Sequence, residues 1–94
     1  MKVVGIEKIE SFTKRHADSR SPTNSWRLEA EEAQWKTPHD IKRRYPDASV
    51  LADNRIVFNI KGNKYRIDVK LSYQHQTVLI IRMGTHKEYS RWKF

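Results

Sequence analysis

The sequence contains no cysteine, few glycines and prolines, and far fewer acidic than basic residues. Without cysteine there can be no disulfide, no thiolate metal ligand and no thiol nucleophile. No apolar run approaches the roughly 20 residues that a membrane-spanning helix needs. Lys2, Glu7 and Lys8 also interrupt the N-terminal stretch where a signal peptide would have its apolar core. We therefore expect a soluble cytoplasmic protein with no membrane partner.

Several common catalytic and metal-binding patterns are absent as well. There is no phosphate-binding glycine loop, no GxSxG nucleophile motif and no paired-carboxylate site. The four histidines are spread over different parts of the chain without metal-ligand spacing; they are His16, His39, His75 and His86. A hydrolase that acts through an activated serine or two acids is therefore poorly supported, and we expect neither a metal nor another cofactor.

The positive charge is concentrated in the C-terminal half. The formal net charge is +8. Residues 1–37 contain seven Lys/Arg and six Asp/Glu, and residues 38–53 contain three of each. Residues 54–94 contain nine Lys/Arg but only two Asp/Glu. A one-sided positive field attracts polyanions, so it favours a nucleic acid over the two alternatives, an acidic protein partner or a charge that only aids solubility.

The length of the chain and the spacing of its apolar residues predict one domain, residues 1–94, that begins with two helices. A period of 3.6 predicts the first helix over residues 5–18. Ser21 is expected to cap the second helix, which begins at Pro22 and runs to about Trp35. Two helices joined so closely predict a helical hairpin.

The remainder of the chain predicts a three-stranded antiparallel meander. Residues 38–53 are expected to form a connection with little regular structure apart from a short helical turn at His39–Arg44. Alternating apolar residues predict strands over Arg55–Ile60 and Lys64–Leu71. Thr77–Met83 is continuously apolar, as expected of a strand buried on both faces. The turns between these strands lie at Lys61–Asn63 and Tyr73–Gln76.

The expected fold is therefore α+β. Its element order is β-α-α-β-β-β with a short C-terminal helix, if Met1–Val4 forms an edge strand and His86–Arg91 a final helical turn. The helical hairpin should cover one face of the small antiparallel sheet. We expect the opposite face to expose Arg66, Lys70 and Lys61, and we place Arg82 on the same face as its strand neighbours Val78 and Ile80.

Arg66, His86 and Tyr89 carry groups that can bind a phosphate or transfer protons, with structural alternatives open for each: His86 can also cap backbone groups or bind a metal, and Tyr89 can be a packing residue. Arg66 is either an ordinary solvent-facing strand residue or a rigidly held fork for a phosphate. His86 and Tyr89 are three positions apart, so a helical turn would place them on one face. RNA can be cleaved when its own 2′-OH attacks the adjacent phosphate, provided that the protein holds the phosphate and transfers protons. A non-catalytic RNA-binding module could carry the same groups.

The stretch from Trp35 to Tyr89 resembles the HigB toxins, the mRNA interferases of HigB/HigA toxin–antitoxin systems. The resemblance rests on six short pieces in the same order and spacing: Lys36-Thr37-Pro38, Asp40-Ile41-Lys42, Tyr45-Pro46, Val57-Phe58-Asn59-Ile60, Gly62-Asn63-Lys64-Tyr65-Arg66 and Thr85-His86-Lys87-Glu88-Tyr89. The first 34 residues match only in length and helical character. One departure is Ser90, which follows Tyr89 where the family often has Asp.

The resemblance implies a RelE-like fold and a ribosome-dependent endoribonuclease that cuts translated mRNA without a metal. It implies a HigA-type helix-turn-helix antitoxin as partner, with mRNA and the ribosome; operator DNA would be contacted only through the antitoxin. By motif position, Arg66, His86 and Tyr89 are the expected catalytic residues. The expected RNA contacts are Lys61, Asn63, Lys70, Arg82 and Lys87. A non-catalytic ribosome-binding module and an inactivated toxin remain as alternatives.

Overall fold

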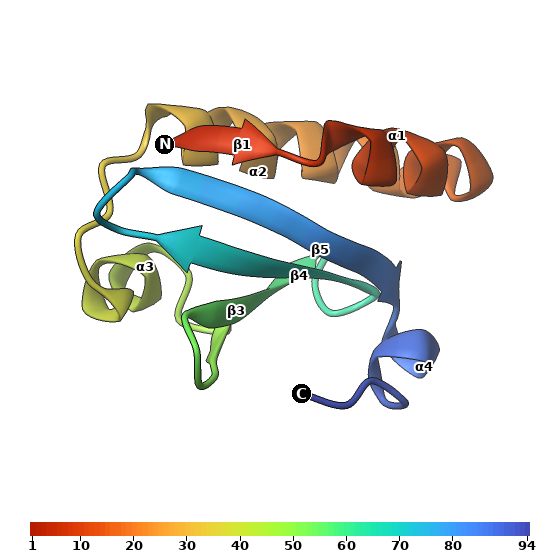
Figure 1. The fold of residues 1–94 in the computed structure, drawn as a ribbon. Coiled ribbons are helices and arrows are strands. Elements are labelled where there is room, and N and C mark those ends of the chain that lie inside the picture. Colours follow the sequence, from red (N-terminus) through yellow and green to blue (C-terminus); the bar gives the residue numbers. More distant parts are fainter.

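A five-stranded sheet with the order β1-β5-β4-β3-β2 forms the middle layer of the computed structural model, which describes residues 1–94 (Figure 1). Its strands are β1 (Lys2–Val4), β2 (Ser49–Val50), β3 (Arg55–Ile60), β4 (Tyr65–Ser72) and β5 (Thr77–Thr85). The helices are α1 (Ile6–Arg15), α2 (Arg20–Glu32), α3 (Pro38–Arg44) and α4 (His86–Tyr89), with a 3-10 turn η1 at Ala17–Ser19. The protein is α+β, as predicted. The meander β3-β4-β5 is antiparallel, but β1 pairs with β5 in parallel, so the sheet as a whole is mixed.

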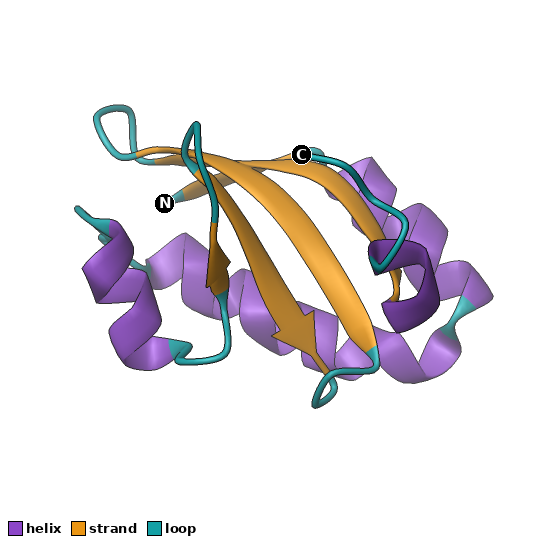
Figure 2. Cartoon of the chain, turned by 90° about the horizontal axis from the view of Figure 1, so that it is seen from below, coloured by secondary structure: helices purple, strands orange, loops and turns teal.

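The sheet lies between helices α1 and α2 on one side and the C-terminal segment on the other (Figures 1 and 2). The core fills the space between the sheet and the two long helices. Its side chains include Phe12 and Trp26 from the helices and Phe58, Ile67 and Ile80 from the sheet, each at most 3% exposed. Burial of a side chain of this size contributes about 1.5–3 kcal/mol. The predicted alternation of β3 and β4 is confirmed on this face.

The two long helices meet at a different place from the one predicted. The first ends at Arg15, and η1 separates it from α2, which begins at Arg20. The predicted first helix over 5–18 was therefore too long, and the predicted start at Pro22 was wrong. Pro22 occupies the third helical position, where its missing N–H is tolerated because the first N–H groups of a helix have no intrahelical acceptor. The second helix ends at Glu32 instead of Trp35.

The segment predicted to be mostly irregular contains a complete helix and an edge strand. Thr37 is the N-cap of α3 and forms a reciprocal capping box with Asp40, while Pro38 begins the helix. Ile41 from this helix is fully buried in the core. The short strand β2 then pairs antiparallel with β3. The predicted helical turn at His39–Arg44 is therefore confirmed by α3, whereas the prediction of little regular structure in the rest of 38–53 missed β2.

A β-bulge in β5 changes which face its last residues occupy. Val69 pairs with Ile80 but Asp68 pairs with Arg82, so Ile81 is the extra residue. Since side chains alternate with a period of two, one inserted residue moves Arg82 to the face opposite Ile80. The predicted placement of Arg82 beside Val78 and Ile80 was therefore wrong. The strand is also not buried on both faces, because Leu79 is 39% exposed.

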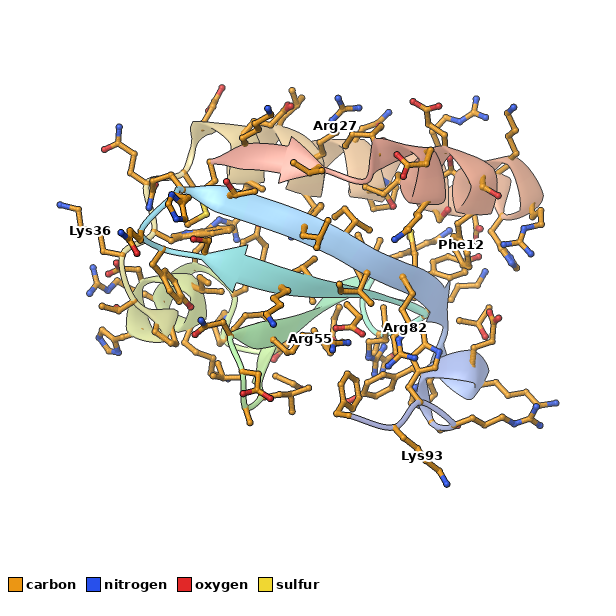
Figure 3. All side chains as sticks on the ribbon, in the orientation of Figure 1. Phe12, Arg27, Lys36, Arg55, Arg82 and Lys93 are labelled. Atoms are coloured by element: carbon orange, nitrogen blue, oxygen red, sulfur yellow. The ribbon has the colours of Figure 1, made fainter.

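The C-terminal segment covers the second face of the sheet at a buried carboxylate, Asp68. Asp68 is completely buried and accepts hydrogen bonds from Arg55 and from Arg82 Nε at 2.9 Å. Phe94 lies over both guanidinium groups, at 5.4 Å from Arg55 and 5.2 Å from Arg82. Figure 3 shows both arginines on the side of the sheet where the C-terminal segment runs. The expectation that this face would expose three basic residues was wrong at Arg66, which is buried, and right at Lys70 and Lys61.

A second carboxylate ties the β3–β4 turn to the helical layer. Asp18, in η1, accepts hydrogen bonds from Lys61 Nζ at 3.0 Å, from Lys64 Nζ at 2.6 Å and from the Tyr65 hydroxyl. The hydrogen bond from Lys64 is the largest cause that holds the pKa of Asp18 well below its usual range. Lys61 and Lys64, at the two ends of the β3–β4 turn, are therefore both bound to η1 through Asp18.

Gly84 is expected to be required for the close packing of the C-terminal segment. A Cβ at this position would lie 2.6 Å from Trp92 Cζ2. Because such overpacking costs about 1–3 kcal/mol, Gly84→Ala should lower the free energy of unfolding by about that amount and shift the indole NMR signal of Trp92. Gly62→Ala is the control, because its Cβ would meet nothing within 4 Å and only its positive φ of 67° is strained. An unchanged Trp92 signal in Gly84→Ala would contradict the packing described.

The Asp18 anchor predicts a specific dependence of stability on pH. Because the folded-state pKa of Asp18 is lowered, its stabilisation is fully present above the ordinary value of 3.8 and is lost as the pH falls through the folded-state pKa. Asp18→Asn should therefore be less stable than the wild type at pH 7, and the difference should shrink below about pH 3.8. Chemical denaturation from pH 7 to pH 2 measures this. Asp53→Asn is the control, because it makes the same charge change at an exposed site with no side-chain partner. The difference in its free energy of unfolding from the wild type should not change with pH. The same pH dependence in both variants would contradict the role of Asp18 described here.

Candidate nucleic-acid interface

Arg66 stands at the centre of the candidate site. It is the second residue of β4 and only 7% exposed. One of its terminal nitrogens, Nη1, donates to the backbone carbonyl of Asn63, and its Cζ lies 4.9 Å from the centre of the Tyr89 ring. The Nε and Nη2 groups bond to nothing within the chain, yet they are not among the buried unpaired atoms. They are therefore free to bind an anion, in the planar geometry that suits a phosphate.

The short helix α4 places His86 and Tyr89 beside this arginine. It begins immediately after β5, and its capping box joins Thr85 to Glu88 in both directions. The backbone N–H of Thr85, which donates to Glu88, is the main cause that lowers the pKa of that carboxyl. The His86 and Tyr89 rings are 6.5 Å apart and nearly parallel, at 26°. The predicted helical turn is confirmed, and it does place both rings on one side.

Two surface depressions meet at Asn63, whose carbonyl holds Arg66. The first has a volume of about 620 Å³ and is lined by His16, Asn63, Lys64, Tyr65, Thr85, His86 and Lys87. The second has a volume of about 510 Å³ and is lined by Asp47, Asn59, Gly62 and Asn63. The first is basic and contains aromatic rings, whereas the second is entirely polar. Arg66 lines neither depression, but it donates a hydrogen bond to the carbonyl of Asn63, the residue that both share.

The residues predicted from the sequence are only partly brought together. Arg66, His86, Tyr89, Asn63 and Lys87 gather at the end of the sheet next to α4. Three other predicted contacts, Lys61, Lys70 and Arg82, lie apart from them.

Each of these three has a different setting. Lys61 belongs to the same turn as Asn63 but is paired with Asp18. Lys70 is exposed four residues further along β4 than Arg66, about 13 Å away at the usual rise of a strand. Arg82 is held by Asp68 and lies 4.4 Å from the Trp92 ring.

Several residues around the depressions were not singled out by the sequence. His16 stacks on Phe12 at 4.3 Å and also lines the first depression. Lys64 lies within the Gly62–Arg66 motif and could have been chosen from that motif. Asp47 and Asn59 belong to segments distant in sequence, and nothing in the sequence signals that they share one depression. The Thr85 and Glu88 capping pair could have been recognised from its T-x-x-E spacing.

The arrangement can hold a phosphate and exchange protons close to it. Arg66 offers free N–H donors, while an imidazole and a phenol stand within one helical turn of each other beside it. No three His, Asp or Glu side chains converge where a metal ion could be held. None of the helices is long and apolar enough to cross a membrane.

A protein-family model matches most of the chain. The family model described as HigB_toxin, RelE-like toxic component of a toxin-antitoxin system, matches residues 19–92. The match includes β4, α4 and the C-terminal segment up to Trp92. A search of the curated proteins finds no match. Because the family match covers most of the chain, the protein belongs to the HigB toxin family, the RelE-like toxic components of toxin–antitoxin systems.

Proposed function

We propose that this toxin is a ribosome-dependent endoribonuclease that cleaves mRNA during translation and so arrests growth. The observation that carries the proposal is the convergence of Arg66, Tyr89 and His86, with a 4.9 Å contact between the first two and 6.5 Å between the two rings. Membership of the HigB family and an α+β fold compatible with a RelE-like toxin add support. Catalysis would occur at the end of the sheet next to α4.

The proposed reaction uses the RNA's own 2′-OH as nucleophile. The 2′-oxygen bonds to the adjacent phosphorus, and the bond from phosphorus to the 5′-oxygen of the next nucleotide breaks. One proton leaves the 2′-OH and one is delivered to the 5′-oxygen, and His86 and Tyr89 are the groups proposed to transfer them. The free N–H groups of Arg66 would neutralise the negative charge that builds up on the phosphate. The products are a 2′,3′-cyclic phosphate and a 5′-hydroxyl.

The proposed partners follow from the same site and from the family. A HigA-type helix-turn-helix antitoxin would bind and neutralise the toxin, and operator DNA would be contacted only through that antitoxin. The ribosome would hold the mRNA in a bent, single-stranded form at the two depressions, which places the 2′-oxygen in line with the bond that breaks. Exposed basic residues such as Lys87 would contact RNA phosphates.

Arg66→Gln and His86→Gln are expected to abolish growth arrest and to reduce mRNA cleavage on ribosomes by at least about 100-fold, because each removes a group used at the reacting phosphate. The measurement is induction in bacteria, with and without the antitoxin, combined with mapping of new 5′ ends in cellular mRNA. The wild type should produce ends inside translated regions, and co-expressed antitoxin should suppress them.

The matched controls are His75→Gln, an exposed histidine in the β4–β5 turn, and Arg20→Gln, an exposed arginine at the start of α2. Both lie away from the site and should leave cleavage unchanged. Thermal unfolding must confirm that Arg66→Gln remains folded, because this substitution alters a buried side chain. His86→Gln alters an exposed side chain, so its loss of activity can be interpreted without that check. A soluble, folded wild type that neither arrests growth nor creates new ends would replace the proposal with a non-catalytic ribosome-binding module or an inactive toxin.

A further inference from the structure

The second depression, which shares Asn63 with the first, contains polar groups that the proposed cleavage reaction does not use. It is lined by Asp47, Asn59, Gly62 and Asn63. The side chains of Asp47, Asn59 and Asn63 make no hydrogen bond or ion pair within the chain, although most polar groups in its neighbourhood are paired. Gly62 has no side chain, and a Cβ there would meet no atom within 4 Å, so the depression is open on that side.

This depression lies next to the proposed phosphate site. Asn59 of β3 is the direct cross-strand partner of Arg66, so the two side chains occupy the same face of the sheet with Cβ atoms about 5 Å apart. Asn63 lines both depressions and binds Arg66 through its carbonyl. A nucleotide whose phosphate rests on Arg66 therefore has one of its neighbouring bases within reach of Asn59 and Asp47.

The two depressions offer different kinds of contact to a base. The first is lined by the rings of His16 and His86, on which a base can stack without regard to its identity, whereas the Tyr65 ring that also lines it is buried. The second contains no ring and no apolar side chain. A base held there is bound through hydrogen bonds at its edge, which is how single-stranded RNA is read for sequence.

Asp47 is the feature that indicates which base is read. It is the only carboxylate that lines either depression. The other acidic groups close to the site are occupied: Asp18 by two lysines, Asp68 by two arginines and Glu88 by the cap of α4. A free carboxylate repels phosphates, so its place on an RNA path is favourable only opposite a group that donates hydrogen bonds.

We propose that Asp47 and Asn59 form a nucleobase-reading subsite that selects guanine next to the scissile phosphate, an inference that rests on the proposed ribonuclease function. Guanine is the only base whose pairing edge presents two adjacent donors, N1–H and N2–H, which match the two acceptor oxygens of a carboxylate. The amide of Asn59 can donate to guanine O6. Adenine and cytosine each place an unprotonated ring nitrogen opposite the carboxylate, which disfavours them.

The test compares cleavage positions for the wild type, Asp47→Asn and Asn59→Ala by mapping 5′ ends of mRNA after induction. Wild-type ends should be enriched in guanine at one position adjacent to the cut. Asp47→Asn replaces two acceptors by one donor and one acceptor, which fit adenine or cytosine, so the guanine preference should fall by about 10- to 100-fold and shift toward those bases. Asn59→Ala should weaken the preference without reversing it.

Asp53→Asn is the matched control, because it removes the same charge from a nearby exposed loop that lines neither depression. It should keep the wild-type profile. A wild type that cleaves without guanine enrichment, or an Asp47→Asn profile identical to that of the wild type, would overturn the subsite while leaving the proposed function standing. Absence of any cleavage by the wild type would instead overturn the proposed function, and the subsite with it.

Discussion

The buried ion cluster of Asp68 with Arg55 and Arg82 is the constraint on which the second face of the sheet depends. A charged carboxylate at 0% exposure is stable only when it is paired and hydrogen-bonded, and the loss of one partner of such a group typically costs about 3–5 kcal/mol. The bulge in β5 supplies the pairing, because it turns Arg82 toward Asp68. The flat faces of the guanidinium groups then carry the aromatic rings of Trp92 and Phe94.

This cluster connects the fold to the candidate site. The rings that pack on Arg82 belong to the segment that follows α4, so the cluster fixes where that segment crosses the sheet. Trp92 also contacts the Tyr89 ring, at 5.7 Å, and lies directly over Gly84, the cross-strand partner of Arg66. Tyr89 is thereby held over Arg66. The ion cluster and Trp92, which take no part in the proposed chemistry, thus position Tyr89 and Arg66, which do.

The same geometry changes how the basic charge should be interpreted. Residues 54–94 carry most of the net charge, yet Arg55 and Arg82 are bound to Asp68, and Lys61 and Lys64 to Asp18. The cations free to meet a phosphate are fewer and, apart from Lys70, lie close to α4. The resulting field is therefore more localised than the composition suggests, which suits the positioning of one phosphate better than the coating of a long nucleic acid.

The sequence correctly predicted the elements whose pattern depends only on neighbouring residues. The alternating residues of β3 and β4 and the three-residue spacing of His86 and Tyr89 depend only on neighbouring positions, and the strands and the helical turn were predicted correctly. The face of Arg82 was predicted wrongly because a bulge is invisible in an alternation pattern. Pro38 was not recognised as the first residue of a helix, although Thr37 before it and Asp40 after it form a capping box.

The candidate site was only partly predictable for a related reason. Arg66, His86 and Tyr89 were found through motifs, and each lies within one continuous stretch of sequence. The burial of Arg66 under Tyr89, the role of Asp18 and the meeting of Asp47 with Asn59 each join segments far apart in the chain. Such contacts are set by tertiary packing, and no single segment carries their signal.

The chemical nature of the RNA ends tests the account most directly. mRNA cut by the purified toxin on programmed ribosomes can be analysed by its sensitivity to enzymes that distinguish phosphorylated from hydroxyl termini. Attack by the 2′-oxygen at a phosphate held on Arg66 predicts a 2′,3′-cyclic or 3′-phosphate on one fragment and a 5′-hydroxyl on the other. Fragments with a 3′-hydroxyl and a 5′-phosphate would show that water or another nucleophile attacks from outside the RNA, and would contradict the mechanism.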